Sequence, residues 1–150
     1  MTARAPKSGL NNTRLAIGVL SGLLGYRLRR AQQAVFRDFA QSVRGISPGR
    51  AGVLMLIEAN PGVTQSRLAH AVELDRSTMV GVLDHLEERA MIERRRGEDR
   101  RTNGLWLTAT GRALLVTMKR RIASHERRVA ARLSAAERKH LVALLEKLAR

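Results

Sequence analysis

Residues 64–108 decide the fold of this chain: Thr64-QSRLAHAVELDRSTMVGVLDHLEERAMIERRRGEDRRTNGLWL-Thr108. A short helical pattern over 64–72 is separated from a longer one over 76–89 by a tight break at 73–75. Short apolar segments then flank a polar turn over 97–104, a pattern typical of an antiparallel ribbon. Helix, turn, helix and basic ribbon in this order predict a winged helix-turn-helix, a module that reads DNA.

Both helices of this stretch begin at residues that can cap them. Thr64 precedes the first helix and Asp75 precedes the second, and a side-chain oxygen at this position accepts a bond from a backbone N–H of the first turn. We expect the second helix to offer its remaining free N–H groups and its positive dipole end to a DNA phosphate.

Amphipathic helices are predicted on both sides of the stretch. Apolar residues recur at helical spacing over 15–44, and Ser47 caps the next helix, which Asn60 ends. After the ribbon, Thr108 caps a long helix that reaches about Leu133. Three residues that share small size in the first helix predict a bend or a close helix contact there: Gly18, Gly22 and Gly25.

The last helix is predicted to begin at a capping box. Ser134 stands at the cap and Glu137 three residues on, and the apolar pattern that follows ends near Leu148. The whole chain is therefore predicted to be mainly α with a small β-wing.

The domain organisation follows from this order. Residues 12–150 form one domain, with a winged helix-turn-helix core over about 47–108 and helices over about 12–44 and 109–150. Residues 1–11 are predicted to form a flexible arm.

The charge of the chain favours a polyanionic partner. Lys and Arg number 28 against 13 Asp and Glu, a formal charge of +15, and most of the cations are arginine. Neutralising phosphates releases condensed counterions, and the arginine fork suits phosphate oxygens and guanine edges. A genome rich in G and C would also enrich arginine.

Several classes of function are disfavoured. The chain has no cysteine, which removes disulfides and thiolate metal sites. No apolar run reaches membrane-spanning length, so we expect no membrane partner and a cytoplasmic, nucleoid-associated protein. No catalytic constellation is present, so we expect no enzyme and no cofactor. Four histidines show no metal-ligand spacing and are interpreted as surface or packing residues: His70, His85, His125 and His140.

The chain from residue 12 onward resembles the MarR family of winged-helix regulators. The resemblance depends on local motifs at characteristic spacing: Leu74-Asp-Arg-Ser-Thr-Met-Val, Leu83-Asp-His-Leu-Glu-Glu-Arg89, Ile92-Glu-Arg-Arg95, Asp99-Arg-Arg101 and Leu107-Thr-x-x-Gly111-Arg. It implies a homodimer in which the first, fifth and sixth helices form the dimerisation body. This agrees with the amphipathic helices at both ends, whose apolar sides have no other evident cover.

The second helix of the motif is expected to enter the major groove, and the start of the first to cross the DNA backbone. Gly81 departs from the polar or basic reader that many family members carry there, so base reading should be weaker, while Val80 could touch a thymine methyl. An ordinary surface helix is the alternative. The DNA contacts expected from the two helices are Gln65, Ser66, Arg67, Arg76, Ser77, Thr78, Val80, Gly81 and His85.

The wing carries five arginines and two acids between residues 94 and 101. An arginine at its tip can enter a narrow minor groove, where negative potential is concentrated. Asp99 is expected to pair with an arginine and shape the wing; the alternative is a plain solvated charge run. The DNA contacts expected from the wing are Arg94, Arg95, Arg96, Arg100 and Arg101.

An effector is implied by the resemblance, since such regulators usually bind a small ligand between the dimer body and the winged lobe. Residues 24–32 together with Phe36 and Phe39 look like the branch that senses hydroxycinnamoyl-type coenzyme A thioesters. Aromatic walls with an anion clamp would suit an aromatic acid or acyl-CoA; alternatively, the two phenylalanines are core and the arginines solvated. The expected ligand residues are Tyr26, Arg27, Arg30, Phe36, Phe39 and Met55.

The sequence thus predicts a homodimeric repressor on a pseudo-palindromic operator, released by a small anionic ligand that is expected to be aromatic. The alternative is a ligand-independent architectural or nonspecific DNA-binding protein, which the charge and Gly81 favour.

Overall fold

The computed structural model describes residues 15–96 and 103–149, which fall in two compact units, Met1–Gln33 and Ala34–Arg150. The first unit contains the 3-10 helix η1 (Gly18–Gly22) and the first part of α1 (Leu24–Ser42). The prediction of one continuous helix from Leu15 is wrong. Gly18 has a φ of +48°, a left-handed conformation that glycine adopts at little cost, and the chain is extended at Leu23.

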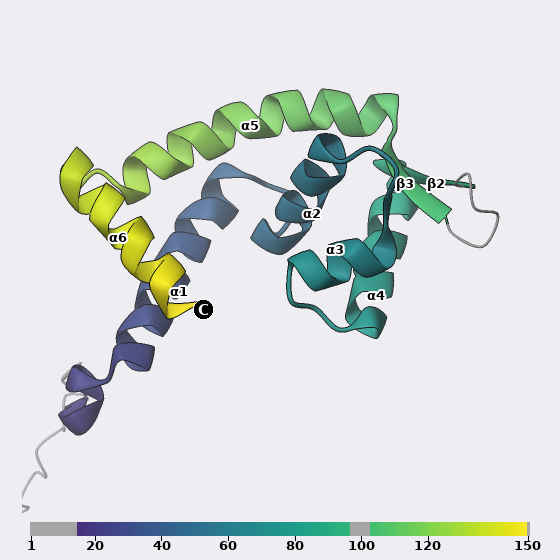
Figure 1. The fold of residues 1–150 in the computed structure, drawn as a ribbon. Coiled ribbons are helices and arrows are strands. Elements are labelled where there is room, and N and C mark those ends of the chain that lie inside the picture. The colour runs from purple at the N-terminus through teal and green to yellow at the C-terminus, as the bar shows by residue number, and fades with distance from the viewer. Residues whose placement is uncertain (1–14, 97–102, 150) are drawn as a thin grey trace, which may run out of the picture. The chain divides into compact units, whose positions relative to one another are not determined.

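The described part of the second unit contains the rest of α1 and five further helices (Figure 1). The prediction that the fifth helix extends to about Leu133 is wrong, because α5 (Ala109–Val129) ends before it and a turn leads to the last helix. Side-chain caps are confirmed at Ser47, Thr64, Asp75, Thr108 and Ser134, the last in a complete capping box. The helices are α2 (Pro48–Ala59), α3 (Gln65–Ala71), α4 (Arg76–Glu88), α5 (Ala109–Val129) and α6 (Ala135–Leu148).

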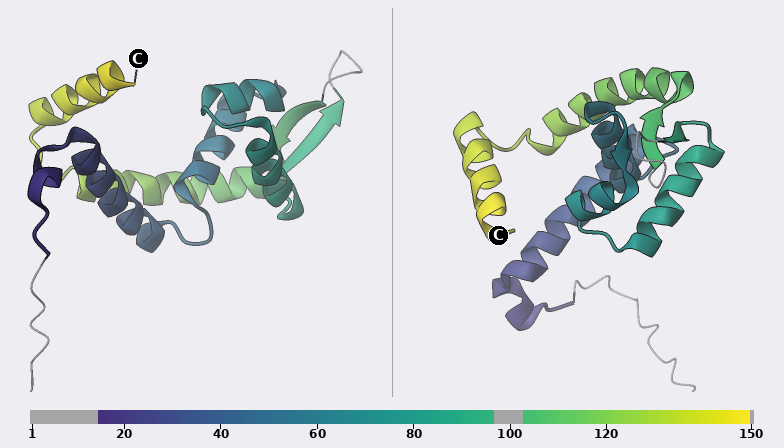
Figure 2. Two further views of the ribbon diagram at one scale, coloured as in Figure 1. Left: turned by 90° about the horizontal axis from the view of Figure 1, so that it is seen from below. Right: turned by 45° about the vertical axis from the view of Figure 1, so that its right-hand side comes forward.

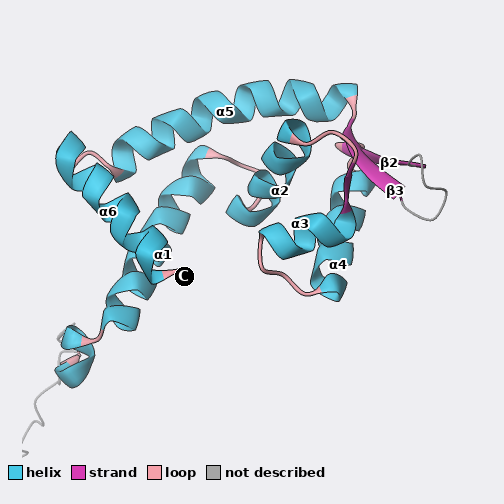
Figure 3. Ribbon diagram, in the orientation of Figure 1, coloured by secondary structure: helices cyan, strands magenta, loops and turns pink. Residues whose placement is uncertain are grey.

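The strands form one antiparallel sheet in the order β1-β3-β2 (Figure 3). The ribbon predicted from the sequence is confirmed as β2 (Ile92–Arg96) and β3 (Asn103–Leu107), and a short strand β1 (Val63–Thr64) pairs with β3. The register places Arg94 opposite Leu105. A mainly α chain with a small β-wing is therefore confirmed.

An aliphatic core joins the helix-turn-helix to the wing and to α5. The side chains at its centre are completely buried, and each contributes roughly 1.5–3 kcal/mol by leaving water. They come from α2, α4 and α5: Leu54, Ile57, Met79, Leu83, Leu86 and Leu115.

The wing is tied directly to the start of α5. The Thr108 hydroxyl donates to the Ala90 carbonyl at 2.6 Å, and the Thr108 N–H donates to the Met91 carbonyl at 3.2 Å. A Cβ on Gly111 would lie 2.0 Å from the Met91 carbonyl oxygen, so this close approach requires glycine. The described wing, α3 and α4 thus lie at one end of α5, and α6 follows its other end (Figure 2).

Candidate functional site

The turn between α3 and α4 fixes the start of the predicted recognition helix. Glu73 takes a φ of +53°, and the Leu74 N–H donates to the Ala69 carbonyl at 3.0 Å. Asp75 then caps α4, its carboxylate accepting the Thr78 N–H at 2.8 Å. This tight turn presents the first residues of α4 to solvent, where Arg76, Ser77 and Thr78 are all exposed.

The cap changes what the helix start can offer to a phosphate. The Ser77 and Thr78 hydroxyls both donate to the Asp75 carboxylate, and with the Thr78 N–H they hold the pKa of Asp75 well below its ordinary range, the Ser77 bond contributing most. The expectation of free donors is therefore only partly met, because the Thr78 N–H and both hydroxyls are already engaged. Arg76 becomes the main group at this end that can meet a phosphate.

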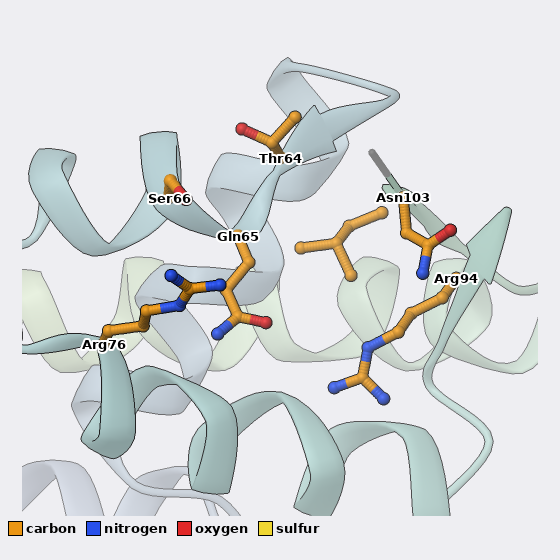
Figure 4. A pocket seen from close by; sticks show the side chains of 7 residues that line it. Thr64, Gln65, Ser66, Arg76, Arg94 and Asn103 are labelled. Carbon is orange, nitrogen blue, oxygen red and sulfur yellow. The ribbon is translucent and has the colours of Figure 1, made fainter. Parts of the chain in front are cut away.

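Arg76 lines a cleft of about 230 Å³ where α3, α4 and the sheet meet (Figure 4). Figure 4 shows the Arg76 and Gln65 side chains on one side and Arg94 and Asn103 on the other. The cleft combines two guanidinium groups with neutral donors, a lining that suits a phosphate oxygen. Its residues are Thr64, Gln65, Ser66, Arg76, Arg94, Asn103 and Leu105.

Sequence reasoning missed Asn103 as part of this cleft. Asn103 begins β3 and precedes Gly104, whose pairing with Thr64 of β1 brings Asn103 beside the start of α3. The sequence placed it in the polar turn, and only the pairing of β3 with β1 shows that it faces the helices.

Arg94 is held between two carboxylates of α4. Its guanidinium donates to Asp84 at 2.6 Å and also to Glu87, and its side chain is 27% exposed. One cation against two acids leaves a local charge of −1, so Arg94 is less able to neutralise a phosphate than Arg76. It fixes β2 to α4, the kind of structural role that the sequence assigned to Asp99, which lies outside the described residues.

The other wing arginines are placed in different ways. Arg95 pairs with Glu93, and its guanidinium carbon lies 5.2 Å from the centre of the Trp106 ring. Arg96 is exposed at the end of β2. Arg100 and Arg101 lie outside the described residues, so their expected groove contacts remain predictions.

The remaining predicted DNA contacts lie on the outward surface of the two helices. Ser66 and Arg67 are exposed at the start of α3, and Gln65 is half-buried there. On α4, Val80 is 37% exposed and a Cβ on Gly81 would meet no atom within 4 Å, so neither is needed for packing. His85 is half-buried one turn further on.

The predicted ligand residues fall in two groups. Tyr26, Arg27 and Arg30 belong to the first unit, where the Arg27 Nε donates to the Ser21 carbonyl at 2.8 Å and Arg30 lies over the Tyr26 ring at 5.9 Å. The other three come together in the second unit.

Phe36, Phe39 and Met55 line one pocket of about 230 Å³ between the end of α1, α2 and α5. Phe39 is buried, Met55 is half-buried and Phe36 is 46% exposed. The other lining residues are Val35, Pro48, Ala51, Ile122, His125 and Glu126. The pocket is therefore mainly apolar, and the predicted anion clamp is not among its lining residues.

His125, which was interpreted from the sequence as a surface or packing residue, is a further residue of this pocket. It is 2% exposed, and its Nδ1 lies 2.6 Å from an Asp38 oxygen on α1. Arg128 donates to the same carboxylate at 2.9 and 3.1 Å. His125 continues the inward stripe of Leu115, Met118 and Ile122 at helical spacing, a signal that could have identified it.

Within residues 15–96 and 103–149, no cluster of three or more His, Asp or Glu side chains is arranged to hold a metal ion. None of the described helices is long and apolar enough to cross a membrane.

Comparison with known proteins places this arrangement in a family. The model of the MarR family matches residues 44–102. A candidate transcriptional regulatory protein for the hcr operon of Thauera aromatica is 41% identical over 140 residues, covering 91% of this chain and 84% of the relative.

Two solved structures of the transcriptional repressor CouR share the fold. CouR bound to a 23-mer DNA duplex is 40% identical with a TM-score of 0.86, covering 92% of this chain and 100% of the CouR chain. CouR bound to p-coumaroyl-CoA is 39% identical with a TM-score of 0.86, covering 91% and 99% of the two chains.

Proposed function

The chain belongs to the MarR family and is a transcriptional regulator rather than an enzyme, and on this basis we propose that it is a homodimeric repressor released from its operator by an aromatic ligand. The observation that carries the proposal is the cleft beside α4, which places Arg76 and neutral donors at the edge of an exposed recognition helix.

The DNA side of the proposal rests on this surface. The α4 start enters a major groove, while Gln65, Ser66 and Arg67 at the α3 start and Arg76 at the cleft contact phosphates. The likeness to CouR bound to a DNA duplex, over 92% of this chain, supports this use of the fold. The proposed contacts remain the predicted set, with Arg94 as the least effective because it is neutralised by α4.

The dimer is supported by apolar surface that the single chain leaves exposed. In the first unit, Leu15 is 90% and Val19 is 85% exposed. On α6, five apolar side chains are 41–53% exposed, which a second copy would cover. They are Leu141, Val142, Leu144, Leu145 and Leu148. A two-fold dimer places its two recognition helices roughly 34–36 Å apart, in successive major grooves of a pseudo-palindromic site.

The ligand side rests on the pocket between α1, α2 and α5. A volume of about 230 Å³ exceeds the roughly 150 Å³ cavity that holds benzene, but it falls below the roughly 300–1,000 Å³ of a complete drug-sized site. The pocket therefore takes one substituted aromatic ring and leaves a larger carrier group outside. CouR bound to p-coumaroyl-CoA, a protein 39% identical to this chain, supports an aromatic acyl-CoA over a free acid.

Release follows from differential affinity. A ligand that binds one spacing of the two winged lobes more tightly shifts the dimer toward that spacing, and DNA binding falls if the spacing no longer matches successive grooves.

A second candidate is a ligand-independent architectural DNA-binding protein. The observation that favours it is the bare Gly81 on the exposed face of α4, which cannot read a base, together with the charge of +15.

One titration separates the candidates. Fluorescence anisotropy would compare DNA from the chain's own upstream region with a scrambled duplex at two salt concentrations, with aromatic acids and their CoA thioesters added at the tightest point. A repressor is expected to bind DNA from its own upstream region roughly 10³-fold or more tightly than the scrambled duplex. This preference should disappear when one of the compounds is added. Equal binding to both duplexes with steep salt dependence would instead support the charge-driven binder.

A further inference from the structure

Two polar side chains, His125 and Glu126, interrupt the apolar pocket, and His125 is the buried one. His125 lines it from α5 with a side chain only 3% exposed, and its ring meets Phe39 edge-on at 5.4 Å and 87°. The α1, α2 and α5 residues around it are mostly hydrocarbon. A buried polar atom without a partner is costly, so the free nitrogen of this ring needs a counterpart.

Asp38 determines which nitrogen is free. Its carboxylate is ionised, because hydrogen bonds from Arg128 first and His125 second hold its pKa well below the ordinary value of 3.8. An ionised carboxylate only accepts, so the 2.6 Å contact is a bond donated by His125 Nδ1–H. The nitrogen left for a ligand is Nε2.

Nε2 can be reached from the pocket. Among the described residues, Nε2 has no hydrogen-bond partner. Every completely buried side-chain nitrogen or oxygen of these residues does have a hydrogen-bond partner. Nε2 therefore retains some accessible surface, and the pocket is the space that His125 lines.

We propose that His125 Nε2 hydrogen-bonds a hydroxyl on the aromatic ring of the effector and so selects hydroxylated aryl groups, a role that rests on the proposed function. A ring hydroxyl both donates and accepts, so it satisfies Nε2 whether the imidazole is neutral or protonated. A bare ring leaves Nε2 unpaired.

The same lining disfavours a ligand that enters with its carboxylate first. The one charged residue in the lining is acidic, since Glu126 lies beside His125, and the Arg128 guanidinium is already bonded to Asp38. An ionised carboxylate among these apolar walls would have no arginine or lysine to pair with. The acyl end therefore points outward, where a neutral thioester linkage leads to the carrier.

The test is the ratio of two affinities. The full chain would be titrated calorimetrically with p-coumaroyl-CoA and with cinnamoyl-CoA, which differs by lacking the ring hydroxyl. The wild type is expected to bind the hydroxylated thioester roughly 10- to 100-fold more tightly, because the other leaves a buried nitrogen unpaired. In His125→Phe the ratio should fall to about one, through loss of p-coumaroyl-CoA affinity.

Met55→Leu is the matched control, because it alters the wall of the same pocket without touching a polar atom. Its affinity for both thioesters should shift together and the ratio should stay as in the wild type. If His125→Phe does not fold, the ¹⁵N resonance of His125 Nε2 in the wild type gives the answer. It should move on adding p-coumaroyl-CoA and much less on adding cinnamoyl-CoA.

The outcomes separate this role from the proposed function. Binding of both thioesters with a wild-type ratio near one, or an unchanged ratio in His125→Phe, overturns the role of His125 and leaves a ligand-responsive repressor standing. Binding of neither thioester, with DNA affinity unaffected by both, removes the acyl-CoA part of the proposed function and the role of His125 with it.

Discussion

Arg76 and Arg94 line the same cleft, but their surroundings predict opposite phenotypes for their substitution. Arg76 is exposed and has no ion-pair partner among the described residues, whereas Arg94 is bonded to Asp84 and Glu87. We expect Arg76→Gln to weaken DNA binding through lost phosphate neutralisation and to leave stability unchanged. We expect Arg94→Gln to lower stability, because it releases β2 from α4.

The magnitudes follow from the charges. Each neutralised phosphate contributes about 0.9 to the slope of log affinity against log salt, so Arg76→Gln should reduce that slope by about 1.8 in a dimer. Between 50 and 200 mM salt, this amounts to about a tenfold smaller loss of affinity than in the wild type. Arg94→Gln removes two half-exposed ion pairs and should lower the free energy of unfolding by about 1 kcal/mol. This corresponds to a Tm decrease of roughly 2–4 °C.

The assay is fluorescence anisotropy on one duplex from the chain's own upstream region at four salt concentrations, with thermal unfolding of each variant at one protein concentration. A salt slope in Arg76→Gln that equals the wild-type slope would refute the assignment of the cleft to a phosphate. A lower Tm in Arg76→Gln, with no change in Arg94→Gln, would refute the structural distinction between them.

Three further predictions concern the fold and its assembly. Gly111→Ala places a Cβ 2.0 Å from the Met91 carbonyl oxygen and should destabilise the protein by about 2–4 kcal/mol in urea unfolding, whereas Gly81→Ala, with no atom within 4 Å, should stabilise it by about 1 kcal/mol; equal effects would contradict the packing at the start of α5. The folded-state pKa of Asp38 is depressed, so its contribution to stability is present above pH 3.8 and is lost as pH falls further; Asp38→Asn should therefore flatten the decline of stability measured by acid unfolding below pH 4, and an unchanged decline would count against the ion pair. Leu145→Glu on α6 should shift the protein from dimer to monomer in sedimentation velocity, and a dimer of wild-type affinity would exclude this face from the interface.

The sequence predicted the elements whose causes are local. Side-chain caps at Ser47 and Thr108 lie next to the helices that they start, and the apolar spacing of α4 alone identifies Leu83 as core. The break near Gly18, which the sequence did not predict, has a local cause too. A helix can continue through Gly18 or end there, depending on whether its hydrogen bonds outweigh the backbone entropy of glycine. The spacing of apolar residues does not indicate which of the two occurs.

The site depended on contacts between distant residues, which no local pattern contains. Asp38 and His125 are 87 positions apart in the chain, and Arg94 is ten positions from Asp84 across two different elements. The sequence predicted Arg94 as a DNA contact, but it could not show that two carboxylates surround the guanidinium. In the same way, it predicted Phe36 and Phe39 as ligand residues without showing that the His125 imidazole lines the same pocket.

Helix α5 connects the proposed ligand pocket to the wing. His125 lies on α5, and the start of α5 is fixed to the wing through Gly111 and Thr108, with no space for even one added carbon atom. We therefore expect a displacement of α5 at the pocket to be transmitted through this junction to the wing. A tenfold loss of DNA affinity requires about 1.4 kcal/mol of coupling, and a single net hydrogen bond contributes about 1 ± 0.5 kcal/mol. The proposed hydrogen bond between a ligand hydroxyl and Nε2, if it forms in only one position of α5, would thus supply much of the free energy that such a switch needs.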